Sequence, residues 1–317
     1  MKARPALLVA TAFALALAGV WGPAGAASAG AAKPAVVKAA ILPITHVVWI
    51  LEENHSYNQI IGVKKDAYLN SLATTYGSAS NAWGITHPSV PNYLGLVSGL
   101  PLTSLPNTDC TRCTQAGPDL FTQKTITRPT PLTWRTYLES MTTACQKNAS
   151  PDGLYVPKHN PPTYFLDITP AACAANDLPF SALATDLKSH NLPQFMYIAP
   201  NQNDNMHTTG NLAGQAWLQA QLPALLTSSE FTSGSMVVFI LWDEGGPTGE
   251  VKGADCTLGT SNSCHIPLLV LSAHTHAVNY ATTVTLYSVL KATEDILGLP
   301  ELGLAQKAPS LRAAFGL

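Results

Sequence analysis

Four short apolar segments, rich in β-branched residues, constrain the fold of this chain more than any other feature. They lie at 46–51, 195–199, 236–242 and 266–271 and have the length and composition of buried strands. Segments with apolar residues at three and four spacing predict helices at 66–76, 91–100, 131–141, 211–227 and 284–297. Strands that alternate with helices predict an α/β fold, with a mainly parallel central sheet covered on both faces.

The segment 101–179 interrupts this alternation. It is rich in threonine and proline and contains four of the six cysteines. It shows no clear strand pattern, and the spacing at 131–141 is helical. We interpret it as an insertion, stapled by disulfides, that covers one end of the sheet.

The N-terminal residues have the order of a secretory signal peptide. Lys2 and Arg4 precede an apolar stretch from Ala6 to Trp21, and small residues follow up to Ala29. The apolar stretch is shorter than the ~20 residues that a membrane-spanning helix needs. We therefore expect cleavage near Ala29, a flexible leader over 30–44 and a secreted protein whose mature chain has no transmembrane segment.

The charge of the chain argues against two classes of partner. Removal of residues 1–29, which carry two positive charges and no negative one, changes the formal net charge from -2 to -4. A mildly acidic chain is a poor match for nucleic acid or for an anionic membrane surface as a permanent partner.

All six cysteines follow the predicted export signal. An even number of cysteines in an exported chain favours disulfides. Among the fifteen possible pairings, proximity in the sequence suggests Cys110–Cys113, Cys145–Cys173 and Cys256–Cys264. The alternative for Cys110 and Cys113 is half of a zinc site or a redox pair, although no second CxxC or HxxxH motif accompanies them.

Acidic and amide residues follow three of the predicted strands. They lie in 52–56 (EENHS), 203–207 (NDNMH) and 243–246 (DEGG). Because ligands of open α/β sheets bind beyond the carboxyl ends of the strands, these residues are expected at one edge. Together they suggest a cation site with oxygen ligands, whereas each taken singly is compatible with a solvated polar loop.

Ser89 precedes the predicted helix that starts at Pro91. A serine here would lie near free backbone amides and the positive end of the helix dipole, which favour a phosphate group. The structural alternative is an N-cap, and the two roles are compatible. Serine needs a base or a metal to become a good nucleophile, and the chain has no GxSxG motif, so activation by a metal is favoured over an esterase mechanism.

Five motifs in this order carry a family resemblance. They are ENHSY at 53–57, HPSVPNY at 87–93, KHNP at 158–161, DNMH at 204–207 and WDEG at 242–245. The series resembles the bacterial phosphoesterase family, which includes secreted acid phosphatases and phospholipases C and belongs to the alkaline-phosphatase-like superfamily. The resemblance covers nearly all of the chain after the signal peptide. It implies an alkaline-phosphatase-like three-layer sandwich and a single catalytic domain over 45–317.

The resemblance also implies roles for individual residues. Ser89 matches the nucleophile that also contacts the metal, and His159 and His207 match histidines that contact the phosphate or protonate the leaving group. The implied ligands of the metal are Glu53, Asn54, Asp243 and, as a further ligand, Glu244.

Two positions are less fixed by the resemblance. Asp204 is expected either to support His207 or to help hold a second cation. Leu286 stands where relatives often have a histidine, and we expect this position to be peripheral.

The implied function is that of a metal-dependent acid phosphatase that hydrolyses phosphomonoesters, phosphoinositides among them, through a phosphoserine intermediate. A histidine acid with pKa ~6.5 predicts an acidic pH optimum. The nearest alternative is a phospholipase C, which the end of the chain at Leu317 disfavours because it leaves no room for a C-terminal domain. A non-catalytic exported metal-binding protein is the third alternative.

The identity of the divalent metal stays open at this stage. Calcium, magnesium and manganese suit oxygen ligands, and histidine also admits zinc or iron. The oligomeric state is equally open.

Overall fold

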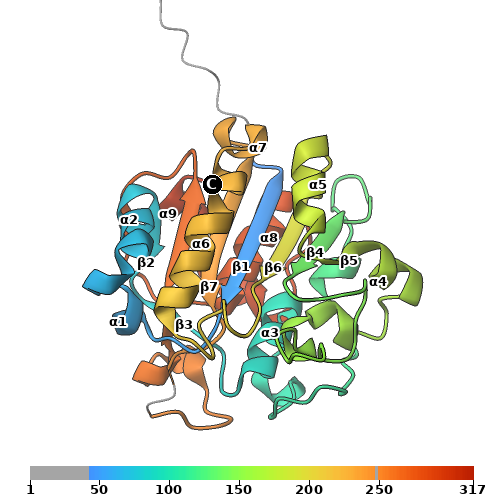
Figure 1. Ribbon diagram of the computed structural model, residues 1–317, viewed down its shortest axis with the longest axis horizontal. Helices are drawn as coiled ribbons and strands as arrows, with labels where there is room; N and C mark the ends of the chain where they lie inside the picture. The colour runs from blue at the N-terminus through green and yellow to red at the C-terminus, as the bar shows by residue number, and fades with distance from the viewer. Residues whose placement is uncertain (1–42, 247–248) are drawn as a thin grey trace, which may run out of the picture. The chain divides into compact units, whose positions relative to one another are not determined.

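An eight-stranded sheet forms the centre of the fold in a computed structural model that describes residues 43–246 and 249–317 (Figure 1). The strand order is β10-β2-β9-β7-β1-β6-β4-β5. The strands are β1 (His46–Glu52), β2 (Gly77–Ala79), β4 (Trp134–Leu138), β5 (Asp177–Pro179), β6 (Phe195–Ala199), β7 (Met236–Trp242), β9 (Leu268–Ser272) and β10 (Val278–Tyr280). Only β9 runs antiparallel to its neighbours, β7 and β2, so the prediction of a mainly parallel sheet is confirmed.

A small second sheet has the order β11-β3-β8. Its strands are β3 (Ala82–Trp83), β8 (His265–Ile266) and β11 (Val284–Thr285). The strand predicted over 266–271 is therefore divided between two sheets at Pro267. Proline has no backbone N–H to donate to a strand ladder, which accounts for the break at this residue.

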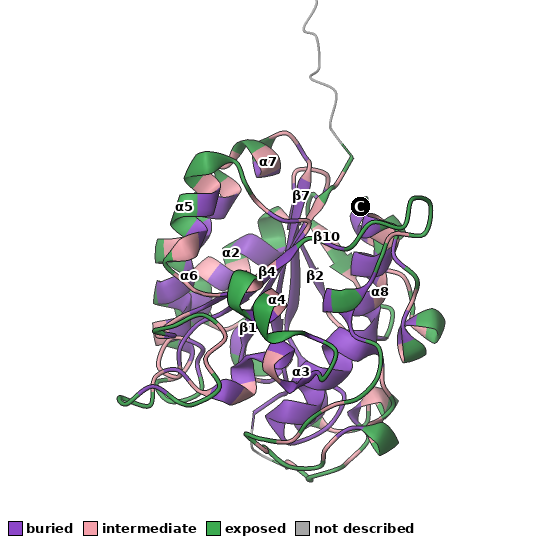
Figure 2. Cartoon of the chain, turned by 90° about the vertical axis from the view of Figure 1, so that its right-hand side faces the viewer, coloured by how far each residue is buried: buried purple, intermediate pink, exposed green. Residues whose placement is uncertain are grey.

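Helices cover both faces of the central sheet. In two views at right angles, α2 (Ala67–Thr75), α5 (Ala182–Ser189) and α6 (Asn211–Leu226) lie on one face, and α3 (Ser89–Ser98) and α8 (Leu286–Leu297) lie on the other (Figures 1 and 2). This arrangement confirms the three-layer α/β sandwich.

Shorter helices connect these elements. The α-helical ones are α1 (Tyr57–Ile60), α4 (Pro170–Asn176), α7 (Ser229–Thr232) and α9 (Arg312–Phe315). The 3₁₀ turns are η1 (Lys64–Asp66), η2 (Leu102–Ser104), η3 (Leu120–Thr122), η4 (Pro157–His159), η5 (Pro161–Tyr164), η6 (Cys256–Leu258), η7 (Asn262–Cys264) and η8 (Gly303–Lys307).

The central strands read as continuous apolar runs because both of their faces are covered. Every residue of β7 is buried, and so is every residue of β1 after His46. Figure 2 shows these strands in the buried colour between the two helical layers. Burial on both faces removes the alternation of apolar and polar residues that a half-exposed strand would show.

The helix predicted over 131–141 is wrong, because this segment forms strand β4. Leu132, Trp134, Tyr137, Leu138 and Met141 have the spacing of a helical face and are all buried. The aromatic and β-branched residues favour a strand, however, and β4 pairs in parallel with β6 over five residues. The segment 101–179 thus supplies β4 and β5 to the central sheet, which corrects the expectation that it contains no strand.

The three predicted disulfides are confirmed. They join Cys110 to Cys113, Cys145 to Cys173 and Cys256 to Cys264. The first two disulfides lie within the connecting segment 101–179. Because Cys110 and Cys113 are bonded to each other, they are not thiolate ligands of a zinc ion. The predicted signal peptide and the first part of the leader lie outside the described residues. Among the described helices, none is both long enough and apolar enough to cross a membrane.

Candidate active site

The loops that follow β1, β6 and β7 are joined by main-chain hydrogen bonds at one edge of the central sheet. The amide of Glu53 donates to the carbonyl of Asn205 at 2.8 Å, and the amide of Asp243 donates to the carbonyl of Glu52 at 3.1 Å. The three polar clusters that the sequence predicted at strand ends therefore do meet, as the parallel strand directions require.

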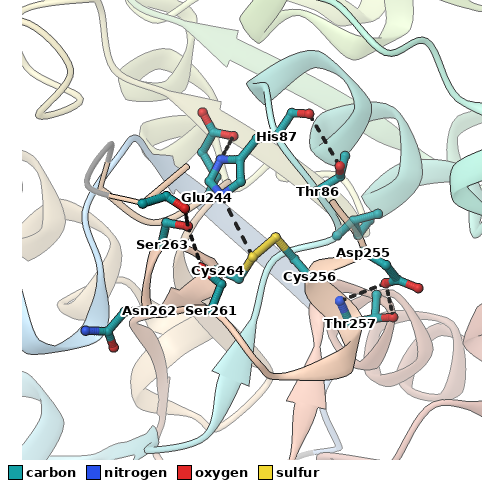
Figure 3. Close-up of a disulfide and its surroundings, with 12 residues drawn as sticks. Thr86, His87, Glu244, Asp255, Cys256, Thr257, Ser261, Asn262, Ser263 and Cys264 are labelled. Atoms are coloured by element: carbon teal, nitrogen blue, oxygen red, sulfur yellow. Dashed lines mark hydrogen bonds and ion pairs between the residues drawn. A yellow bond between two sulfur atoms is a disulfide. The ribbon is translucent and has the colours of Figure 1, made fainter. Parts of the chain in front are cut away.

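Ser89 is the first residue of α3, and Pro88 occupies the N-cap position. The helix thus begins two residues before the predicted start at Pro91, and the alternative of Ser89 as an N-cap is wrong. The Ser89 hydroxyl, only 1% exposed, donates to Oε1 of Glu244 at 3.2 Å. His87 Nδ1 lies 2.8 Å from the other oxygen of Glu244, beside the Cys256–Cys264 disulfide (Figure 3).

Helix α3 is buried along its whole length, including Ser89. Tyr93 lies four residues after Ser89, which is the spacing that places two side chains on one helix face. Its hydroxyl donates to Oε1 of Glu53 at 2.7 Å. One face of α3 therefore contacts acidic residues from the ends of both β1 and β7.

Glu53 is fully buried and is surrounded by donors. Besides Tyr93, its carboxylate contacts Lys158 Nζ at 3.2 Å, His159 Nε2, and His207 Nε2 at 3.7 Å. Burial alone would raise the pKa of Glu53, but the charges of His159, Lys158 and His207 outweigh burial and hold the pKa well below its usual range. These contacts favour the ionised form of Glu53.

Asp243 and Glu244 have the opposite tendency. Burial, followed by the negative charges of Glu53 and Glu244, raises the pKa of Asp243 well above its usual range, and Lys158 and the Ser89 hydroxyl only partly offset this. Burial and the charges of Glu53 and Glu250 raise the pKa of Glu244 to about 9. The protein's own cations thus do not neutralise the acidic groups at this site, which favours a bound cation.

Two buried oxygens in this cluster have no hydrogen-bond partner among the described residues: Oδ1 of Asn54 and Oδ2 of Asp243. Asn54 has a φ of 54°, a left-handed conformation that asparagine tolerates better than most residues. Because buried oxygens without a partner are costly, these two fit the ligand set of a divalent cation. Glu53 and Glu244 fit less simply, since protein groups already contact both oxygens of each.

Two other groups of described residues bring three metal-ligating atoms together. They are His87 with Cys256 and Cys264, and Asp177 with Cys145 and Cys173. Their cysteine sulfurs form disulfides and so are not thiolate ligands. The oxygen-rich cluster at the strand ends is the stronger candidate.

The Phosphoesterase family model matches residues 64–300. The chain belongs to this family. It is 32% identical over 306 residues to the phosphatidylinositol-3-phosphatase of Mycobacterium tuberculosis (strain ATCC 25618 / H37Rv), and the alignment covers 96% of this chain and 94% of that protein. It is also 30% identical over 234 residues to the acid phosphatase of Aspergillus niger, covering 71% of this chain and 52% of the fungal protein.

A solved structure supports the same placement at the level of the fold. It is a protein in the alkaline phosphatase superfamily from Vibrio parahaemolyticus, with a TM-score of 0.53 and 11% sequence identity. The match covers 87% of this chain and 73% of that chain. This family member is thus a phosphoric ester hydrolase with an alkaline-phosphatase-like fold.

In this phosphoesterase, Asp204 follows β6 and lies near the acidic residues Glu52 and Glu139. Its charge contributes to raising the pKa of Glu52 and of Glu139, after the larger effect of burial on each. Asp204 therefore belongs with a second group of acidic residues, and a role at a second cation stays a prediction. Leu286 is 1% exposed in the hydrophobic core.

Sequence reasoning about this phosphoesterase missed Tyr93, Lys158 and Asp109. Asp109 accepts a hydrogen bond from the amide of Val90, the residue after Ser89, at 3.0 Å. The spacing of Tyr93 from Ser89 and the position of Lys158 beside His159 were available signals for the first two. Nothing local marks Asp109, because its role depends on a contact across the fold.

Proposed function

We propose that this phosphoesterase is a secreted, metal-dependent acid phosphatase that hydrolyses phosphomonoesters, phosphoinositides among them, through a phosphoserine intermediate. The observation that carries this proposal is the position of the Ser89 hydroxyl, which contacts Glu244 and lies beside Asp243. The buried Oδ2 of Asp243 has no hydrogen-bond partner among the described residues. The names of the fungal and mycobacterial relatives support acid phosphatase activity and an inositide substrate, respectively.

The residues that would hold a divalent cation are Asn54, Asp243, Glu244 and Ser89, with Glu53 beside them. When bound, such a cation supplies charge neutralisation for the phosphate and lowers the pKa of the serine hydroxyl. The oxygen-rich set suits magnesium, calcium or manganese, and the nearby histidines also admit zinc or iron.

The chain's own residues supply the nucleophile and the proton donor. The Ser89 oxygen attacks phosphorus in line with the leaving group, forming the serine–phosphorus bond as the ester bond breaks. The leaving alkoxide takes a proton from a histidine. His207, whose side chain is 37% exposed, is better placed to meet a leaving group than His159, which is 4% exposed and held against Glu53. Water then cleaves the phosphoserine and regenerates Ser89.

Export is supported by two independent features. The sequence over residues 1–29 has the order of a signal peptide. All six cysteines form disulfides, which persist in oxidising compartments.

The decisive experiment combines metal analysis with phosphate release from p-nitrophenyl phosphate by the mature protein. Ser89→Ala should lower kcat by at least about 10³-fold, since loss of a nucleophile removes the covalent step. Ser98→Ala, a buried serine on the same helix, is the matched control. Acid-quenched wild-type protein should carry a phosphoryl group on the peptide that contains Ser89.

Wild-type turnover by Ser89→Ala would end the nucleophile assignment. Faster cleavage of p-nitrophenyl phosphorylcholine than of p-nitrophenyl phosphate would favour the phospholipase C alternative. A pH–rate profile with its maximum above neutrality would contradict the acid phosphatase assignment.

A further inference from the structure

A cavity of about 310 Å³ lies within the connecting segment 101–179, and the proposed mechanism does not use it. Arg112 and Lys147 line it together with the hydroxyl-bearing residues Thr111, Thr114 and Thr163. No acidic residue contributes to its lining. The Thr163 hydroxyl already donates to the Asn160 carbonyl at 2.8 Å. The cavity therefore presents two cations and the hydroxyl groups of Thr111 and Thr114, which is chemistry that suits a phosphate group.

Neither cation has an acidic partner in the described part of the chain. The salt bridges of the described residues involve other cations, and no side-chain hydrogen bond engages Arg112 or Lys147. Both residues are exposed, so solvation alone would satisfy them. Their convergence on one cavity, without a carboxylate, is what distinguishes them from ordinary surface charges.

The segment that contains Arg112 is linked by a hydrogen bond to the residue after Ser89. Arg112 lies between Cys110 and Cys113, which form a disulfide. Asp109, the residue before Cys110, accepts the hydrogen bond from the Val90 amide, directly after Ser89. Arg112 is the third residue after Asp109, which corresponds to at most about 11 Å along an extended chain. Arg112 thus belongs to the segment that contacts the start of α3.

The segment that contains Lys147 is linked by two hydrogen bonds to the turn that contains His159. Tyr155 donates its hydroxyl hydrogen to the carbonyl of Gln146, the residue before Lys147. The side-chain amide of Asn160 in turn donates to the Tyr155 hydroxyl at 2.9 Å. Asn160 directly follows His159, so the two walls of the cavity are fixed to the two segments that supply Ser89 and His159.

We propose that this cavity is a second anion subsite, which binds a negatively charged group of the substrate while its phosphomonoester lies at Ser89. The inference rests on the proposed phosphatase function and narrows its substrate class to phosphomonoesters with a second anionic group. That group is a further phosphomonoester, as in a soluble bisphosphate, or a phosphodiester, as in a lipid headgroup; both share the chemistry that Arg112 and Lys147 recognise.

The test compares KM values for three substrates in the double variant Arg112→Gln/Lys147→Gln. The substrates are p-nitrophenyl phosphate, fructose 1,6-bisphosphate and glycerophosphoinositol phosphate, in which the second anion is absent, a monoester and a diester, respectively. The matched control is Lys124→Gln/Arg128→Gln, which removes the same charge from exposed positions outside the cavity lining.

We expect KM to rise roughly 3- to 30-fold for at least one of the two substrates with a second anion, the range expected from losing two exposed ionic contacts. The kcat values and the KM for p-nitrophenyl phosphate should stay at wild-type levels, and the control variant should leave every KM unchanged. The substrate that responds identifies the source of the second anion. An equal rise in KM for all three substrates would overturn the proposal. So would an unchanged KM for both substrates that carry a second anionic group.

A failure of the proposed function is distinguishable from a failure of the subsite. If the wild-type protein hydrolyses none of these esters, the same compounds can be titrated calorimetrically against both double variants. Weaker binding in Arg112→Gln/Lys147→Gln alone would still support the subsite, and unchanged binding would refute it.

Discussion

The acidic residues at the ends of β1 and β7 and the carboxyl group of Glu294 in α8 are all buried, yet their surroundings differ. Glu294 accepts hydrogen bonds from the Leu302 amide at 3.0 Å and from Gln123 at 3.4 Å. Burial raises the pKa of Glu294 to about 8. It thus resembles Asp243 and Glu244 in burial and in the direction of its pKa shift.

Glu294 and Asp243 share two further features: each has one buried oxygen without a partner among the described residues, and acidic neighbours raise the pKa of each. They differ in that only Asp243 has the Ser89 hydroxyl and the Lys158 cation beside it. Glu294 instead joins α8 to two neighbouring loops. Burial with a raised pKa is therefore shared by Glu294 and by a carboxyl group of the proposed active site, so a raised pKa alone does not identify a functional acid.

Asp243→Asn should give the largest effect that separates the two regions. The change removes the charge from the oxygen without a partner, and we expect at least about a 100-fold loss of kcat together with loss of the metal, because even residues that only support metal ligands cost 10- to 100-fold. Metal content by mass spectrometry and circular dichroism of the same sample measure the two effects. A variant with full metal content and full activity would place the catalytic cation elsewhere.

Tyr93→Phe should have a smaller effect on the same region. It removes the hydroxyl that donates to Glu53. A hydrogen bond to a charged group contributes about 1.5–3 kcal/mol, and the lower end of this range corresponds to roughly a tenfold fall in kcat, which is the effect we expect. Tyr287→Phe is the matched control, since the Tyr287 hydroxyl donates to the Leu100 carbonyl outside the acidic cluster. If both variants lose equal activity, Tyr93 acts only through the fold.

Glu294→Gln should leave kcat unchanged and alter only the pH dependence of stability. The carboxyl group has a pKa of about 8 when folded against 4.5 as its reference, so the folded state binds the extra proton between these values. Its contribution to stability is present in full below about pH 4.5 and is lost as the pH rises towards about 8. Glutamine cannot ionise, so the variant should gain stability relative to wild type as the pH rises. Urea unfolding at pH 5 and pH 8 measures this gain, and parallel changes in both proteins would contradict it.

The parts of the fold that the sequence predicted well are those in which local pattern and tertiary environment agree. β6 and β7 have the predicted bounds because both faces of these strands are covered, so an apolar run is the only pattern that fits. The prediction for β4 was wrong because its buried residues have helical spacing, whereas its strand conformation depends on pairing with β6. The direction of β9 was likewise beyond local pattern.

The candidate site shows the same division. Ser89, Asp243 and Glu244 stand directly at an element boundary, where position along the chain implies position in space. The position of Lys158 beside His159 marks it as a candidate, but its contact with Glu53 spans 105 residues of sequence and depends on the fold. The excess of negative charge, which depends on all of these groups together, is visible only in the folded arrangement.

Helix α3 has no face in contact with solvent, and this bears on how the enzyme can diverge over evolutionary time. A side chain at Gly95 would approach Ile85 to 2.6 Å, and one at Gly99 would come within 2.2 Å of the Leu302 carbonyl. Substitutions on the helix that begins at Ser89, the proposed nucleophile, are therefore constrained by packing whatever their effect on catalysis. New substrate preferences are more accessible through the loops around the helix, where mutational tolerance is higher.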